Sequence, residues 1–259
     1  MRLKKTLGQH LLVNKSALEK IVRSLNPSKQ DIVMEIGPGT GNLTKILAEH
    51  AGTVIAIEKD MEMVERLNIL SQDFKNLKII HADFLKLDLP SLFYDLRFAI
   101  YNSRLFCGNL PYNISTPILF KLRDNKEMFS RGVIMVQREV AKRLVAKPGN
   151  KDYGVLSIML QTDAGIKKIF DLSPGSFLPP PKVTSTVLSV EFPSPPPYQV
   201  KKRDQFEQIV KGAFNQRRKM IRNTLPPELL SLLKTVNIKP TDRPENLSIA
   251  DFIKLSELF

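Results

Sequence analysis

The chain has 259 residues, of which 42% are hydrophobic and 25% are charged. This balance is typical of a folded, soluble protein and excludes a disordered one. No apolar run of about 18 residues is present, so the sequence predicts no membrane crossing. The short apolar stretch after the basic start does not fit a signal peptide. The net charge of +13 predicts a polyanionic partner, RNA or DNA, although a lysine-rich surface also occurs without one.

Cysteine and histidine content argues against disulfide and metal chemistry. Cys107 is the single cysteine, and the three histidines, His10, His50 and His81, are too scattered for a zinc pattern. The sequence therefore predicts no metal site.

Residues 1–30 carry seven Lys or Arg against one Glu. A helical pattern follows inside them, with Leu18, Ile21, Val22 and Leu25 recurring on one face. By themselves these residues favour a basic, frayed N-terminus.

A buried strand at Ile32–Ile36 then leads into a glycine-rich turn, with Gly37, Gly39 and Gly41, and a helix. Such a turn lets the backbone approach a ligand closely. Pyrophosphate binding is disfavoured, because the third glycine comes one residue too early for a dinucleotide fingerprint. A nucleoside-containing cofactor remains the prediction, against the alternative that the glycines serve only the turn.

Two further strands end in acidic residues. Thr53–Ile57 is followed by Glu58, 21 residues after Gly37, where an acidic side chain accepts hydrogen bonds from ribose hydroxyls. After a helix at Met61–Leu70, the strand Leu77–His81 leads to Asp83 and Phe84. Asp83 is predicted to accept from an adenine amine and Phe84 to pack on the ring, although Asp83 alone also fits a cap.

The fourth strand, in Leu105–Tyr112, ends in Asn-Leu-Pro-Tyr. An adenine amine is a poor nucleophile, and two acceptors on its N–H groups let the nitrogen aim its lone pair at a methyl donor. The Asn109 side-chain oxygen and the Leu110 carbonyl are the predicted acceptors, and Tyr112 is predicted to stack on the base. The alternative is a plain proline turn.

A strand at Val183–Val190 is followed by prolines, and the predicted domains are residues 1–192 and 193–259. The second is helical and basic. Its segment Phe214–Leu225 has no acidic residue, and its candidate phosphate contacts are Arg217, Arg218, Lys219 and Arg222. A solvated helix face is the alternative.

Glu-x-Gly-x-Gly-x-Gly followed by an acidic strand end resembles the class I methyltransferases, which bind S-adenosylmethionine. The chain further resembles the KsgA-type ribosomal RNA adenine dimethyltransferases. The resemblance runs from Leu7 to the C-terminus, and its motifs lie at Gly8–Leu12, Leu105–Leu119, Val136–Leu144, Tyr153–Ser157, Ser176–Val183 and Asn215–Lys219.

This resemblance implies an α/β fold, with a seven-stranded, mostly parallel sheet, helices on both faces and a small all-α C-terminal domain. It implies that His10 and Leu12 touch S-adenosylmethionine and that Phe177 stacks on a flipped adenine opposite Tyr112. The implied reaction is dimethylation of N6 on two adjacent adenosines in a hairpin near the 3′ end of small-subunit (16S) ribosomal RNA. The implied protein is a cytoplasmic monomer that acts on the assembling small subunit.

Three rivals remain. A large-subunit adenine methyltransferase of the macrolide-resistance type shares the chemistry, but usually has Ile at the Leu110 position and lacks the basic tail. A ribosome-assembly or transcription factor of the same lineage acts partly or wholly without catalysis, yet Glu58, Asn109 and Tyr112 are intact here. A DNA adenine methyltransferase would usually have Asp or Ser in place of Asn109.

Overall fold

The computed structural model describes residues 10–95 and 103–258. Leu7, Gly8 and Gln9 of the predicted opening motif, with the basic residues before them, lie outside the described residues.

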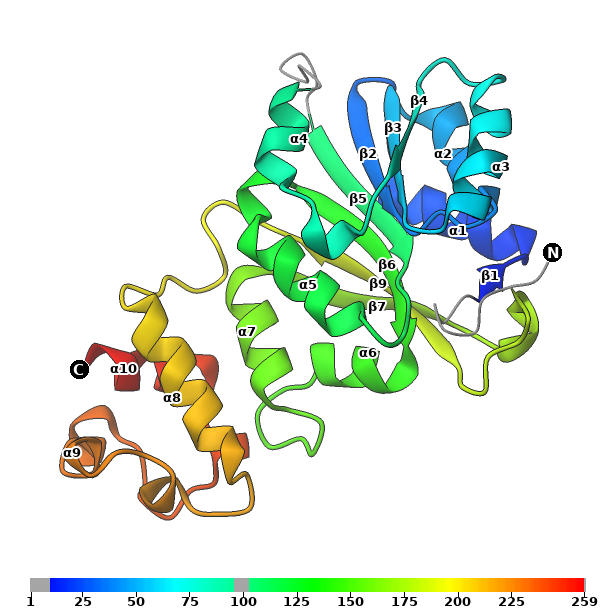
Figure 1. The fold of residues 1–259 in the computed structure, drawn as a ribbon. Coiled ribbons are helices and arrows are strands. Elements are labelled where there is room, and N and C mark those ends of the chain that lie inside the picture. The colour runs from blue at the N-terminus through cyan, green and yellow to red at the C-terminus, as the bar shows by residue number, and fades with distance from the viewer. Residues whose placement is uncertain (1–9, 96–102, 259) are drawn as a thin grey trace. The chain divides into compact units, whose positions relative to one another are not determined.

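Strands and helices alternate along the first part of the chain (Figure 1). The strands are β1 (Leu11–Leu12), β2 (Asp31–Ile36), β3 (Thr53–Glu58), β4 (Leu77–His81), β5 (Ser103–Asn109), β6 (Arg131–Gln137), β7 (Gly165–Leu172), β8 (Phe177–Leu178) and β9 (Ser185–Glu191). The helices among them are α1 (Lys15–Leu25), α2 (Asn42–His50), α3 (Met61–Ser71), α4 (Leu89–Asp95), α5 (Ser115–Asp124), α6 (Arg138–Leu144) and α7 (Val155–Asp163).

Seven of the strands form one sheet in the order β4-β3-β2-β5-β6-β9-β7. The pairs β4-β3, β3-β2, β2-β5 and β5-β6 are parallel, and β6-β9 is antiparallel. The predicted seven-stranded, mostly parallel sheet is therefore confirmed. Because parallel strands end at the same edge, the residues that follow β2, β3, β4 and β5 come together there.

The central strands are buried along their whole length, as their apolar sequences predict. Every residue of β2 and β3 is buried. Figure 1 shows α1, α2 and α3 to one side of the sheet and α4 and α5 to the other. A strand covered on both faces favours a continuous apolar run over an alternating one.

The chain forms two compact units, residues 1–141 with 166–192, and residues 142–165 with 193–259. The second unit contains the predicted C-terminal domain, but it also contains residues 142–165, which the sequence assigned to the first domain. The contacts that hold that segment in the second unit include an ion pair and a backbone hydrogen bond. Arg203 forms an ion pair with Asp163, which is 1% exposed, and Tyr198 N donates to Thr162 O at 3.2 Å. Side-chain pairing over this separation is not visible in local sequence patterns.

The second unit continues with α8 (Arg203–Asn215), α9 (Pro227–Leu230) and α10 (Ile249–Glu257). Its aromatic centre consists of Tyr153, Phe214 and Phe252. The ring centroid of Phe214 lies 6.4 Å from that of Tyr153 and 6.0 Å from that of Phe252. Helix α9 is short, and a 3₁₀ turn, Leu233–Val236, follows it. Within the described ranges, no helix has the length and apolarity needed to cross a membrane.

Candidate active site

The turn between β2 and α2 requires glycine. Gly37, Gly39 and Gly41 have φ of 68°, 57° and 85°, a left-handed region that other residues rarely adopt. A Cβ on Gly39 would also lie 2.7 Å from Leu11 Cδ2. The glycines therefore serve the turn and, at Gly39, the close approach of the N-terminal segment.

Glu58, the last residue of β3, is 7% exposed and is held by backbone amides. Its Oε2 accepts from Gly39 N at 3.0 Å, and its Oε1 accepts from Lys59 N and Asp60 N, both at 2.8 Å. These bonds fix the position of the carboxyl group at the end of β3. Glu58 thus ties the end of β3 to the glycine turn while also facing the cavity described below.

Asp83 follows β4 and caps a 3₁₀ turn, Phe84–Lys86. Its Oδ1 accepts from Leu85 N at 3.0 Å, and its Oδ2 accepts from Lys59 Nζ at 2.9 Å. The Lys59 ammonium holds the pKa of the Asp83 carboxyl below its usual range. Asp83 is therefore a cap, as its local sequence allowed, and also an ionised acceptor.

Asn109 ends β5, and its two amide atoms differ in their bonding. Nδ2 donates to His10 O at 2.6 Å. Oδ1 is buried and has no hydrogen-bond partner among the residues that the structure describes. A buried acceptor without a partner costs about 1–3 kcal/mol. Its position suits a donor that arrives with a ligand.

Tyr112 lies beside the N-terminal segment. Its hydroxyl is 2.6 Å from Ser185 Oγ, and burial raises the pKa of that hydroxyl. The His10 ring stacks on Tyr112 with centroids 5.5 Å apart and planes at 27°, while His10 Nδ1 is 2.8 Å from Pro179 O. The Tyr112 ring thus already has one aromatic partner in this structure.

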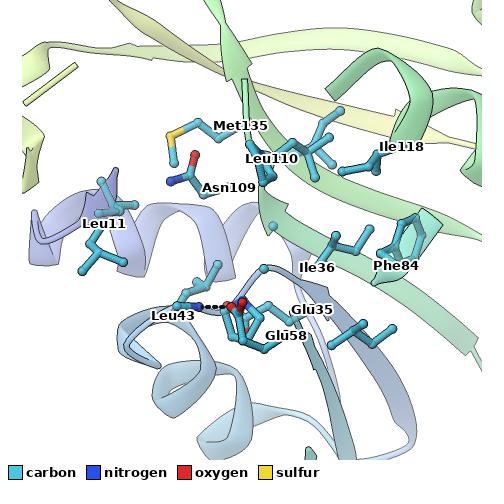
Figure 2. Close-up of a pocket in the computed structure, with 18 of the residues that line it drawn as sticks. Leu11, Glu35, Ile36, Leu43, Glu58, Phe84, Asn109, Leu110, Ile118 and Met135 are labelled. Carbon is cyan, nitrogen blue, oxygen red and sulfur yellow. Dashed lines mark hydrogen bonds between the residues drawn. The ribbon is translucent and has the colours of Figure 1, made fainter. Parts of the chain in front are cut away.

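One cavity of about 250 Å³ joins these groups (Figure 2). On its glycine-turn side lie Gly37, Gly39, Glu58 and Asp83, and on its Asn109 side lie Asn109, Leu110 and Tyr112. His10, Leu12 and Phe84 also line it. The structure therefore brings together every residue predicted to bind the cofactor and three of the four predicted catalytic residues.

The family model for ribosomal RNA adenine dimethylase matches residues 1–259. The chain belongs to this family. The predicted enzyme class, an S-adenosylmethionine-dependent methyltransferase of ribosomal RNA adenine, is thereby confirmed.

Similar proteins named ribosomal RNA small subunit methyltransferase A occur in several bacteria. The one from Geobacter metallireducens is 39% identical, with 99% of this chain and 95% of that protein covered. The one from Clostridium botulinum strain Langeland is 38% identical, with 98% of this chain and 92% of that protein covered.

Solved structures agree with the dimethylase fold. A dimethyladenosine transferase from Plasmodium falciparum superposes with a TM-score of 0.81 at 27% identity, covering 95% of this chain and 96% of that one. The 23S rRNA methyltransferase ErmE superposes with a TM-score of 0.72 at 21% identity, covering 95% of this chain and 98% of that one. The latter likeness concerns the fold alone.

Among the four predicted catalytic residues, Phe177 is the one that does not line this cavity. It pairs with Leu12 in the two-stranded ribbon of β1 and β8, is 3% exposed, and belongs to the core of the first unit. Its neighbour Leu178 is 60% exposed. Because side chains alternate along a strand, only one of the two can point outward, and the ribbon register turns Phe177 inward. Stacking of Phe177 on a base stays a prediction, and in this structure the side chain is packed in the core instead.

Glu35, the acidic residue of the Glu-x-Gly-x-Gly-x-Gly motif, also lines the cavity, although the sequence interpretation gave it no role of its own. It lies in β2 beside Ala56 of β3 and Cys107 of β5, and is 2% exposed. Burial, together with a smaller contribution from the charge of Glu58, raises the pKa of Glu35 to about 8, against the nearby Thr44 hydroxyl, which lowers it. An acidic residue inside a strand that is buried on both faces is the sequence signal that could have identified it.

The four predicted phosphate contacts lie in the second unit, at and after the end of α8. Arg217 donates through Nε to Glu245 Oε2 at 2.8 Å and also contacts the Asn150 carbonyl at 3.4 Å. Arg218, Lys219 and Arg222 are exposed. Arg217 thus has a structural ion pair, whereas its three neighbours are accessible to a ligand.

The cavity between the glycine turn and Asn109 fits S-adenosylmethionine by the chemistry of the residues that line it. The buried Glu35 Oε2 and Asn109 Oδ1 both lack a hydrogen-bond partner among the described residues, and cations and amines supply the donors that such atoms need. In residues 10–95 and 103–258, no cluster of three or more His, Cys, Asp or Glu side chains could hold a metal ion.

Proposed function

We propose that this chain dimethylates N6 of two adjacent adenosines in a hairpin near the 3′ end of small-subunit (16S) ribosomal RNA. The observation that carries the proposal is the buried acceptor Asn109 Oδ1 at the end of β5, which has no hydrogen-bond partner in the described part of the chain and belongs to a residue that lines the cavity with Glu58 and Asp83. The choice of the small subunit rests on relatives with that name at 37–39% identity over nearly their full length.

S-adenosylmethionine supplies an electrophilic methyl group on a sulfonium. Glu58 would accept hydrogen bonds from the ribose, Asp83 would accept from the adenine amine, and Phe84 would pack on the adenine ring. Gly37 and Gly39 would admit the amino-acid part, and His10 and Leu12 would close over the cofactor. Glu58 and Asp83 suit this role because backbone amides and Lys59 already hold them in place.

The target amine is activated by acceptors, without a charged base. Asn109 Oδ1 and the Leu110 carbonyl would accept its two N–H groups, so that the nitrogen turns its lone pair toward the methyl group. Tyr112 would stack on the adenine once the base is extruded from the RNA. Since His10 now stacks on Tyr112, we expect the base either to displace the His10 ring or to use the other face of Tyr112.

The RNA would be held by phosphate contacts in the second unit, from Arg218, Lys219 and Arg222, together with basic residues near the N-terminus. We propose that the protein acts as a cytoplasmic monomer on the assembling small subunit.

The test is mass mapping of methylated adenines after incubation with under-methylated small subunits, with large subunits as the comparison. Dimethylation of two adjacent adenines near the 3′ end of the small-subunit RNA is expected. Modification of the large-subunit RNA would identify the macrolide-resistance type of enzyme instead. Binding to small subunits without methylation would identify an assembly or transcription factor.

A further inference from the structure

A lysine of α5 holds the turn from which Phe84 lines the cavity. Lys121 Nζ donates to Leu85 O at 3.0 Å and also to Leu87 O. The same ammonium lies 5.5 Å from the centroid of the Phe84 ring, within the range in which a cation is attracted to an aromatic face. Lys121 therefore contacts both the backbone of the turn and the ring that the turn carries.

The position of Lys121 follows from the helix to which it belongs. Helix α5 comes soon after the turn that ends at Tyr112. Ile118 of this helix lines the cavity (Figure 2), and Lys121 lies three residues later, on the same face of the helix. The helix that starts on the Asn109 side of the cavity thus reaches the Phe84 turn through Lys121.

Lys121 differs from a solvated surface lysine. It is half-buried, and burial holds the pKa of its ammonium below its usual range, although the carboxylates of Asp83 and Asp88 act in the opposite direction. An ammonium has three donors and no acceptor, and a charged group that leaves water needs partners. The two carbonyls and the Phe84 ring are such partners, so the ammonium is held in a definite geometry.

The turn at residues 83–87 is held at both of its ends. At its start, Lys59 forms an ion pair with the Asp83 side chain at 2.9 Å. At its end, Lys121 bonds to backbone carbonyls and lies over the Phe84 ring. Lys59 thus fixes the predicted acceptor of the adenine amine, and Lys121 fixes the ring that is predicted to pack on the adenine.

We propose that Lys121 is a positioning residue for cofactor binding, which holds the Phe84 ring where it packs on the adenine of S-adenosylmethionine. The inference rests on the proposed function, because it takes Phe84 as a wall of the adenine site. Lys121 is absent from the described residues that line the cavity. It therefore acts through Phe84 and does not touch the ligand.

The experiment is titration calorimetry of S-adenosylhomocysteine with the full chain, Lys121→Met, Lys121→Arg, Phe84→Leu and the double variant Lys121→Met with Phe84→Leu. The Met side chain is close to Lys in length but has neither the charge nor the donors, whereas Arg keeps both. The matched control is Lys86→Met, which removes the charge of an exposed lysine of the same turn that also acts on the Asp83 carboxylate. Denaturant unfolding without ligand measures stability separately.

We expect Lys121→Met to raise the dissociation constant about tenfold, Lys121→Arg to restore most of that loss, and Lys86→Met to change it by less than about twofold. In the Phe84→Leu background, Lys121→Met should raise the constant by less than about twofold, because the residue through which it acts is gone. A merely structural lysine would lower stability in either background and leave the affinity of the folded protein unaltered.

Kinetics should divide in the same way. In methyl transfer to under-methylated small subunits, Lys121→Met should raise KM for S-adenosylmethionine about tenfold and keep kcat within about twofold of wild type, because an interaction with the non-reacting part of the cofactor serves the ground state and the transition state alike. A fall in kcat at unchanged KM would overturn the inference.

Two calorimetric results would also overturn it. One is equal affinity of wild type and Lys121→Met, and the other is an equal loss with and without Phe84, since Lys121 would then act elsewhere. If S-adenosylhomocysteine binds wild type and either result is found, only the role of Lys121 fails. If it does not bind wild type, the proposed function fails as well. Should Lys121→Met not fold, Lys121→Gln, which keeps an amide donor without the charge, takes its place with the same expected direction.

Discussion

The two sides of the cavity differ in how their polar groups are bonded. On the glycine-turn side, Glu58 accepts from three backbone amides, and Asp83 accepts from Leu85 N and Lys59. On the Asn109 side, Asn109 Oδ1 is buried without a partner among the described residues. Groups that only bind a ligand can be held rigidly by the backbone, whereas a group that must act on an incoming amine has to remain available. Glu35, on the glycine-turn side, is the exception.

The largest effect is expected from Phe177→Ala, which tests whether Phe177 belongs to the core or to the Asn109 side of the cavity. Phe177 is 3% exposed in the core, so its truncation should lower the free energy of unfolding by about 3–5 kcal/mol. Denaturant unfolding measures this, and Leu178→Ala, at a position 60% exposed, is the matched control with an expected change within about 0.5 kcal/mol. Similar stability of the two variants, with methylation lost only in Phe177→Ala, would support the predicted role of Phe177 at the base.

Asn109→Ala should next reduce methyl transfer by on the order of 100-fold or more, since it removes a positioned acceptor. Cofactor affinity should stay close to that of wild type, because the glycine-turn side is unchanged. Single-turnover kinetics on under-methylated small subunits, with calorimetry of cofactor binding, measures both. Normal turnover would reduce Asn109 to a turn residue.

Glu58→Ala should differ from Asn109→Ala, because its main effect should be on cofactor affinity. Loss of a charge-assisted bond to the ribose would weaken cofactor binding by about 1.5–3 kcal/mol. The Gly39 amide also loses its partner at 3.0 Å, so the turn itself should loosen. Glu58→Gln, which keeps one acceptor oxygen, should lie between the two proteins in calorimetry. Unchanged affinity in Glu58→Ala would remove Glu58 from the cofactor site.

A smaller effect, spread over pH, is expected from Glu35→Gln in the ligand-free protein. The pKa of Glu35 is raised from 4.5 to about 8, so between these values the folded state keeps a proton that the unfolded state loses. Wild type should therefore lose about 1.4 kcal/mol of stability per pH unit from pH 5 to 8 through this group. Glu35→Gln should remove that contribution. Parallel curves of unfolding free energy against pH would contradict the assignment.

The smallest effect on the cavity is expected from the basic segment of the second unit. Replacing Arg218, Lys219 and Arg222 by Ala should flatten the dependence of log affinity for small subunits on log salt by about two or three units. Arg217→Ala should instead lower stability by about 1 kcal/mol or less, through its ion pair with Glu245. Cofactor affinity should not change in the triple variant or in Arg217→Ala. Equal salt slopes for the triple variant and wild type would mean that RNA binds elsewhere.

The sequence by itself determined the elements that build the cavity. Apolar runs predicted β2, β3 and β4, and the structure has them within one residue of Ile32–Ile36, Thr53–Ile57 and Leu77–His81. Parallel strands bring their carboxyl ends to one edge. Glu58, Asp83 and Asn109 could therefore be assigned to one site from their positions at strand ends. The strands and their ends can be located from the hydrophobic pattern of neighbouring residues alone.

Only the tertiary structure decided how individual side chains are bonded. Whether Phe177 or Leu178 points inward depends on the register with Leu11 and Leu12, and the ion pair of Arg217 depends on a residue at position 245. The raised pKa of Glu35 depends on burial and on Glu58, a residue of the neighbouring strand. Each of these outcomes requires partners that are distant along the chain, and one sequence without its fold does not specify which distant residues become neighbours.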